Sequence, residues 1–142
     1  METLKQKVER LLDANFNRAR EGLRVIEDTA RFILDSPEMT AKAKRMRSRL
    51  SEIQTKASVP LSSRDTENDS GTSMHSKTER KRDSLQQIVR ANAKRTQESL
   101  RVLEEFLKLN QPGLAQEIKQ LRYNSYILEE EIIEALEKWT RN

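Results

Sequence analysis

The chain carries the same 14-residue motif twice, and this repeat limits its fold more than any other feature of the sequence. The two copies, Ala14–Glu27 and Ala91–Glu104, are offset by 77 positions and share eight identical residues. Further matches follow at an offset of 75 positions: Pro37 with Pro112, and Met46-Arg47 with Leu121-Arg122. The chain is therefore a duplicated unit, with two residues fewer in the linker inside the second copy.

Each unit has the sequence pattern of two helices. Apolar residues recur at three- and four-residue spacing, which is the period of an amphipathic helix. Two capping-box patterns mark helix starts and three prolines mark breaks: Thr3-x-x-Gln6, Ser76-x-x-Glu79, Pro37, Pro60 and Pro112. Together these signals predict helices at residues 3–34, 38–57, 77–110 and 113–140.

Two helix hairpins predict a four-helix bundle. A two-repeat array is too short for a solenoid, because stable solenoids usually need three or more repeats. Two hairpins can instead close on each other with approximate two-fold symmetry. We therefore expect an all-α, single-domain fold over residues 1–142, made of repeat one (3–57), a loop (58–75) and repeat two (76–140).

Composition fits this fold and excludes several classes of protein. Hydrophobic residues make up 35% of the chain and charged residues another 35%, as expected for helices with a narrow apolar stripe and a wide polar face. The lack of cysteine excludes disulfides and thiolate metal sites and favours a cytoplasmic location. The longest aliphatic or aromatic runs are triplets, so we expect no membrane span. The net charge of +4 is compatible with anionic partners.

A repeated asparagine lies in the middle of the apolar stripe of each long helix. These residues are Asn15 and Asn92. A buried amide without a hydrogen-bond partner costs about 1–3 kcal/mol, so each side chain must meet a polar group. One interpretation is a structural contact that fixes helix register, for example between the two amides across the two-fold axis. The other is that the amides face a ligand in the bundle, where such sites are commonly built.

The charged members of the repeat also allow two interpretations. Arg18 and Arg95 lie at the edge of the apolar stripe, where a guanidinium can reach an anion and stay partly solvated. Glu21, Arg24 and Glu27 continue around the polar side and are expected to form a solvated ladder of ion pairs, worth a few tenths of a kcal/mol each. Their repetition in both halves argues for a more specific role.

Other charged and polar residues give weaker signals. The basic cluster Lys42, Lys44, Arg45, Arg47 and Arg49 is expected to be a solvated helix face. A nucleic-acid patch is the alternative, but almost no aromatic residues interleave with it. The single histidine, at position 75, is expected to be an ordinary loop residue. Neither a Ser-His-Asp set nor a glycine-rich phosphate loop is evident.

The stretch between the repeats has no apolar period, but its charges are ordered. Carboxylates occupy alternate positions, at Asp65, Glu67 and Asp69, and Gly71 follows them. Alternate carboxylates can hold a hard cation such as Mg²⁺, and glycine beside hydroxyls lets backbone N–H groups approach phosphate oxygens. The calcium-loop template fails, because the glycine comes one position early and Ser76 stands where glutamate is required. A solvated linker is the alternative, although bundle connections usually take only two to eight residues.

Four ordered blocks of residues together resemble a known family. They are Asp13-Ala14-Asn15-x-x-Arg18-Ala19-Arg20-Glu21-Gly22-Leu23-Arg24-Val25-x-Glu27-Asp28, Arg64-Asp65-Thr66-Glu67-x-Asp69-x-Gly71-Thr72, Ala91-Asn92-x-Lys94-Arg95-x-x-Glu98-x-Leu100-Arg101-Val102-x-Glu104-Glu105 and Leu121-Arg122-Tyr123. The set resembles the helical domain that stands in front of thiamine-phosphate synthase in some bacteria and is sometimes encoded alone. The resemblance covers nearly the whole chain, and the first and third blocks are long enough to be specific.

This domain is similar to the second type of hydroxymethylpyrimidine-phosphate kinase, which is unrelated to the ribokinase fold. The resemblance implies ATP-dependent phosphorylation of 4-amino-5-hydroxymethyl-2-methylpyrimidine phosphate to its diphosphate, the substrate that the synthase consumes, with ATP and Mg²⁺ as cofactors. Phosphoryl transfer needs positioning and charge neutralisation, which repeated arginines and loop carboxylates can supply. No synthase barrel follows Asn142, so synthase activity itself is not expected.

The resemblance also implies a set of site residues. The catalytic carboxylates would be Asp65, Glu67 and Asp69, with Asp65 and Asp69 as Mg²⁺ ligands. The substrate-binding residues would be Asn15, Arg18, Arg64, Thr66, Gly71, Thr72, Asn92, Arg95, Glu98 and Arg122. Among these, the three helical arginines would bind phosphates, and the two asparagines would read the pyrimidine or fix helix register.

The expected partner is a phosphorylated pyrimidine small molecule, and thiamine-phosphate synthase is a further candidate. The sequence leaves a homo-oligomer open. Two other functions remain as alternatives: a non-catalytic helical module that binds the synthase or its pyrimidine substrate, and a basic RNA-binding bundle. Substrate-dependent ATP turnover distinguishes the kinase from the non-catalytic module. A steep fall in polynucleotide affinity with rising salt concentration would identify the RNA-binding bundle.

Overall fold

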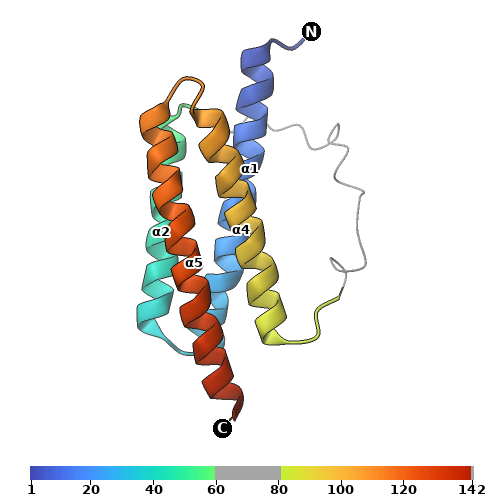
Figure 1. The fold of residues 1–142 in the computed structure, drawn as a ribbon, viewed down its shortest axis with the longest axis vertical. Coiled ribbons are helices and arrows are strands. Elements are labelled where there is room, and N and C mark those ends of the chain that lie inside the picture. The colour runs from blue at the N-terminus through green and yellow to red at the C-terminus, as the bar shows by residue number, and fades with distance from the viewer. Residues whose placement is uncertain (60–80, 142) are drawn as a thin grey trace.

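The structure, a computed structural model, describes residues 1–59 and 81–141. Within these residues the elements are α1 (Leu4–Asp28), the short π-helical segment η1 (Thr29–Ile33), α2 (Pro37–Lys56), α4 (Leu85–Leu107) and α5 (Pro112–Arg141). Figure 1 shows the four α-helices lying side by side as an elongated bundle. The predicted all-α bundle is therefore confirmed.

Helix starts follow the capping signals in the sequence. Thr3 Oγ1 accepts a hydrogen bond from the Gln6 N–H at 3.1 Å, and the Thr3 N–H donates to Gln6 Oε1 at 2.9 Å. Ser36 caps α2 by accepting from the Met39 N–H at 3.2 Å, with Pro37 as the first helical residue. The three predicted spans of residues 3–34, 38–57 and 113–140 are confirmed to within a few residues, except that the last turn of the first span is π-helical.

The predicted start of the third helix at residue 77 is wrong. Residues 81–83 are not helical, and α4 begins at Leu85 after Ser84, whose hydroxyl accepts from the Gln87 N–H at 3.1 Å. The helix also ends at Leu107 rather than at residue 110. The physical reason is that residues 81–84 contain no apolar side chain, so a helix there would have nothing to bury. The Ser76 capping box lies outside the described residues.

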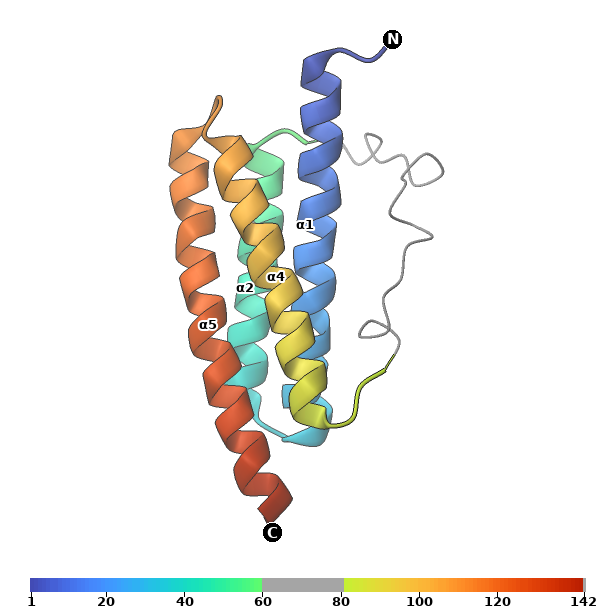
Figure 2. The same cartoon turned by 45° about the vertical axis from the view of Figure 1, so that its right-hand side comes forward.

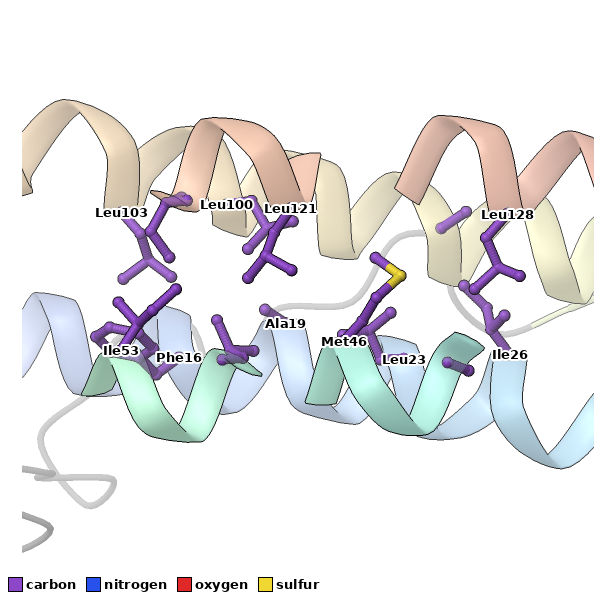
Figure 3. Packing of buried hydrophobic residues seen from close by; sticks show 14 of the residues in the cluster. Phe16, Ala19, Leu23, Ile26, Met46, Ile53, Leu100, Leu103, Leu121 and Leu128 are labelled. Atoms are coloured by element: carbon purple, nitrogen blue, oxygen red, sulfur yellow. The ribbon is translucent and has the colours of Figure 1, made fainter. Parts of the chain in front are cut away.

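The helices form a ring in which each packs against two others. α1 contacts α2 and α4, and α5 contacts α4 and α2. Figures 1 and 2 show that neighbours in this ring run antiparallel. Leucine, isoleucine and phenylalanine side chains from all four helices fill the centre, as Figure 3 shows for Phe16, Leu23, Ile53, Leu100 and Leu128.

Two helices come very close together at Gly22, where α1 meets α4. A Cβ atom at this position would overlap Thr96 Oγ1 and lie 2.7 Å from the Asn92 carbonyl oxygen. Thr96 Oγ1 also lies 3.4 Å from the Ala19 carbonyl oxygen. Only glycine allows the two backbones to come this close.

The two hairpins are joined across the length of the bundle. α2 ends at the end of the bundle where α1 begins, whereas α4 begins at the opposite end (Figures 1 and 2). The 20 residues of α2 correspond to about 30 Å, which a chain covers with no fewer than about nine extended residues. A connection of two to eight residues, typical of bundles, is therefore too short here, although the 28 residues between α2 and α4 are about three times this minimum.

Candidate functional site

The structure divides the repeated polar residues into two groups. One group ties the two helices of each hairpin together. Glu27 and Glu104, at equivalent positions, are only 3% and 4% exposed. Arg47 Nε and Nη2 donate to the two oxygens of Glu27 at 3.0 and 3.1 Å, and Arg122 Nε and Nη2 donate to Glu104 Oε1 at 3.2 and 3.0 Å. The expectation of a solvated ladder is therefore wrong for both glutamates, because each faces an arginine on the neighbouring helix.

This pairing changes the interpretation of Arg122, which the sequence predicts as a phosphate ligand. Burial by itself lowers the pKa of its guanidinium, but hydrogen bonds to Glu104 and Tyr126 outweigh this effect and raise the pKa above its ordinary value. Its equivalent Arg47 makes the same contact in the other hairpin. The geometry therefore assigns Arg122 to the hairpin interface, and a phosphate contact by this residue stays a prediction.

The basic cluster on α2 is also more ordered than expected. Lys42 pairs with Glu131 of α5 at 2.8 Å, Arg47 pairs with Glu27 of α1, and Arg49 pairs with Glu117 of α5. Lys42 and Arg49 are exposed nevertheless, so the interpretation as a solvated face is wrong only for Arg47, whose side chain is 20% exposed. Lys44 and Arg45 are exposed and have no hydrogen-bond or ion-pair partner within residues 1–59 and 81–141.

The second group of repeated polar residues lies where α1 meets α4. Two of its members, Asn15 and Asn92, make equivalent hydrogen bonds. Asn15 is 5% exposed and Asn92 is half-buried. Each Nδ2 donates to the carbonyl four residues earlier in its own helix, at 2.9 Å to Leu11 and 2.8 Å to Ile88. A direct contact between the two amides is therefore not needed to satisfy them. No residue in the described part of the chain donates to either carboxamide oxygen, so both oxygens can accept from a ligand.

Arg18 and Arg95 lie on one outer surface. Arg20 of α1 donates to Gln54 of α2, so position 18, on the other side of Ala19, points away from α2. In the same way Gln97 of α4 donates to Glu129 of α5 at 2.8 Å, so Arg95 points away from α5. Ala19 and Thr96 meet where α1 crosses α4. Both guanidiniums therefore lie along the outer surface of the α1–α4 junction, at the level of the crossing.

We call this outer surface, together with the helix junction beneath it, the α1/α4 seam. It carries the repeated pairs Asn15 with Asn92, Arg18 with Arg95, and Val25 with Val102, with Gly22 and Ser99 buried in the junction. Arg18 and Arg95 are exposed, and neither has a hydrogen-bond or ion-pair partner among the residues that the structure describes. Glu98 is exposed as well, but it lines a pocket between α4 and α5 together with Arg122. The seam therefore offers two unpaired cations and two amide oxygens, a combination suited to an anion that carries a hydrogen-bond donor.

The sequence interpretation missed a polar network between α1 and α2. Asp13 is 1% exposed and lies within 3.4 Å of Gln54 Nε2 and Asn17 Nδ2. Arg20 joins the network through Gln54 and Asn17 Oδ1, and its pKa is lowered by burial although Asp13 and Glu21 raise it. The signal was present in the sequence, because Asp13 begins the first block of the family resemblance.

Several predicted site residues lie outside the described part of the chain. They are Arg64, Asp65, Thr66, Glu67, Asp69, Gly71 and Thr72, and the expectation for His75 falls there too. Within residues 1–59 and 81–141, no group of three or more histidine, cysteine or acidic residues could hold a metal ion. No helix in these same two ranges is both long and apolar enough to cross a membrane.

Comparisons with known proteins agree with the resemblance. A thiamine-phosphate synthase of Nostoc punctiforme is 42% identical over 132 residues, which cover 93% of this chain and 37% of the relative. One from Gloeobacter violaceus is 45% identical over 124 residues, or 87% of this chain and 36% of the relative. The chain thus spans little more than a third of the length of these relatives. No solved structure matches it. The ThiD2 family model matches residues 10–131, so the chain belongs to the ThiD2 family.

Proposed function

We propose that the chain phosphorylates 4-amino-5-hydroxymethyl-2-methylpyrimidine phosphate to its diphosphate, with ATP as the phosphoryl donor. Membership of the ThiD2 family and relatives named thiamine-phosphate synthase support a role in thiamine biosynthesis. The family resemblance adds the kinase step, which would supply the substrate of such a synthase. The synthase activity of the relatives is not part of the proposal, because the chain spans only 35–37% of the length of these relatives.

The pair of arginines on the α1/α4 seam is the observation that carries the proposal. Arg18 and Arg95 recur in both repeats, yet neither packs in the core or pairs with a described acid. Like charges on one surface repel each other, so an anionic ligand between them would relieve an unfavourable interaction. One guanidinium can bind the phosphate of the pyrimidine and the other the phosphoryl group being transferred, with fork-like hydrogen bonds.

The other predicted residues complete this proposed site. The oxygens of Asn15 and Asn92 can accept hydrogen bonds from the amino group of the pyrimidine. Glu98, also on the exposed side of α4, stays a proposed substrate contact. Arg64, Thr66, Gly71 and Thr72 are proposed as phosphate contacts on the strength of the sequence pattern and the family resemblance.

Mg²⁺ is proposed to bind Asp65 and Asp69, with Glu67 as the third carboxylate of the group. Their alternate spacing supports the assignment. The described residues contribute cations and amides but no metal-binding cluster, so the acidic ligands would come from this part of the sequence. When bound, Mg²⁺ would neutralise charge on the phosphates.

Arginine substitutions on the seam test the proposal. We expect Arg18→Ala and Arg95→Ala each to lower kcat for ATP-dependent diphosphate formation by roughly 100-fold, the loss typical of one transition-state charge contact. Thermal unfolding should stay near that of the parent, because exposed substitutions usually change stability by less than about 0.5 kcal/mol. Arg45→Ala is the matched control, since Arg45 is also exposed but lies on α2.

The outcomes separate the alternatives. If the parent binds the pyrimidine phosphate but does not turn over ATP with it, the chain is a non-catalytic binding module. If both seam variants turn over at the parent rate, the active site lies elsewhere on the molecule. Assays should follow formation of the pyrimidine diphosphate directly, so that background ATP hydrolysis is not counted.

A further inference from the structure

The surface formed by α2 and α5, which we call the α2/α5 face, lies on the side of the ring opposite the α1/α4 seam. Its two helices carry opposite charges. α2 contributes the cations Lys42, Arg45 and Arg49, and α5 contributes the acids Glu117, Glu131 and Glu134. Within one copy, some of these charges already pair across the face, as in Lys42 with Glu131 and Arg49 with Glu117. Arg45 is left without a partner among the described residues.

The α2/α5 face also has an apolar centre. A groove of about 350 Å³ runs between the helices, and its lining includes the buried Met46, Leu121 and Leu128. Ile127 lines the same groove but is 59% exposed, and Tyr123, one turn earlier on α5, is 47% exposed. Seventy-five residues earlier, in the first repeat, Glu52 is equivalent to Ile127 and Ser48 is equivalent to Tyr123. The bundle therefore does not require large apolar side chains here, and their exposure indicates an interaction surface.

We propose that the α2/α5 face binds a second copy of the chain across a two-fold axis parallel to the helices. Rotation about this axis places α5 of each copy on α2 of its partner, so that acidic residues meet basic residues at both contacts. A two-fold axis lying in the face but perpendicular to the helices would instead place cations on cations and acids on acids. Charge complementarity therefore favours a second copy of the chain as the partner, related by the two-fold axis parallel to the helices.

The expected size of the contact is sufficient for a reversible dimer. Two helices, each about 10 Å wide and 30 Å long, present on the order of 600 Å² per copy, compared with roughly 800 Å² in a standard interface. The α1/α4 seam stays exposed in this dimer because it lies on the opposite side of each bundle. The proposal therefore does not rest on the proposed function, and its test does not depend on activity.

Charge reversal on one helix at a time tests the arrangement. One variant carries Arg45→Glu, and the other carries Glu134→Lys. Each variant alone would place like charges at both contacts, so we expect it to sediment as a monomer where the parent dimerises. An equimolar mixture restores opposite charges at both contacts, so we expect dimers of one copy of each variant.

Two controls keep this test specific. Arg45 has no described partner to lose, and the ion pair of Glu134 with Lys138 is exposed and contributes little. Thermal unfolding of both variants should therefore match that of the parent. Ile127→Ser should raise the dimer dissociation constant by about tenfold or more, whereas Phe32→Ser, at an exposed site on η1, should not change it.

The decisive measurement is sedimentation equilibrium over a range of concentrations. A dimeric parent, monomeric single variants and a dimeric mixture support the proposal. A parent that stays monomeric at every concentration overturns it. A mixture that stays monomeric while the parent dimerises overturns the α2-on-α5 arrangement.

Discussion

The buried glutamates show what the repeated charges do at the scale of single residues. Each is held by an arginine from the next helix and approached by a second arginine one turn earlier in its own helix, at 3.5 Å for Arg24 and 3.4 Å for Arg101. A carboxylate removed from water is tolerated only when its oxygens are paired in this way. The two ion pairs therefore fix how the helices of each hairpin lie against each other.

Removing one partner of such a pair should destabilise the bundle. For Arg47→Ala we expect a loss of roughly 2–3 kcal/mol in the free energy of unfolding, below the roughly 3–5 kcal/mol typical of buried pairs because Arg24 remains near Glu27. The double variant Glu27→Leu with Arg47→Met should be close to the parent, since no charge is left buried. Urea unfolding measures both, with Lys44→Ala as the control on the same helix. A single variant as stable as the parent would contradict this account.

The same residues show where prediction from sequence ends. The repeat and the capping signals were enough to place four helices, apart from the start of the third, because both depend on local sequence. The burial of Glu27 was not predictable in the same way, since its partner Arg47 lies on another helix and periodicity does not say from which side that helix approaches. The seam could be anticipated only in part: Arg18 and Arg95 stood out because they repeat, whereas their position on a shared surface follows from the antiparallel crossing.

At the scale of secondary structure elements, the α1–α4 crossing depends on one glycine. Alanine is the better helix former by about 1 kcal/mol, so a helix interior normally gains from replacing glycine. At Gly22 this gain is opposed by contact with Thr96 Oγ1 and with the Asn92 carbonyl, and the backbone atom cannot rotate away. The close contact also sets the spacing of the two seam arginines.

Substitution of the two described glycines should therefore have opposite effects. Gly22→Ala should lower the free energy of unfolding by roughly 1–3 kcal/mol, as overpacking does. Gly113→Ala should be neutral or slightly stabilising, because a methyl group at this position on α5 would meet no atom within 4 Å. Thermal unfolding of the two variants gives the comparison. A stabilising Gly22→Ala would show that the helices can separate at little cost.

At the scale of the whole molecule, the antiparallel ring requires a long connection between the hairpins. About nine extended residues would reach from one end of the bundle to the other, and the 28 residues between α2 and α4 exceed this minimum. Because part of the length only spans the bundle, function must be tested by residue identity rather than by length. The carboxylates at positions 65 and 69 are the residues to change.

Asp65→Asn and Asp69→Asn keep the length of the connection and remove its proposed Mg²⁺ ligands. We expect each to lower the rate of phosphoryl transfer by orders of magnitude, with unfolding curves within about 0.5 kcal/mol of the parent. Rates should be measured over a range of Mg²⁺ concentrations, with Asn68→Ala as the neighbouring control. Parent rates in both variants would mean that the segment only connects the hairpins.

The contact at Gly22 has a consequence for the origin of the chain. Gly22 of the first repeat lies against Thr96 of the second, and the equivalents of these residues are Ser99 and Ala19. If the first hairpin paired with a copy of itself, glycine would meet alanine and leave a void. If the second did so, serine would meet threonine and crowd the crossing. The two repeats have therefore diverged at this contact since the duplication. As a result, each hairpin packs better against the other than against a copy of itself.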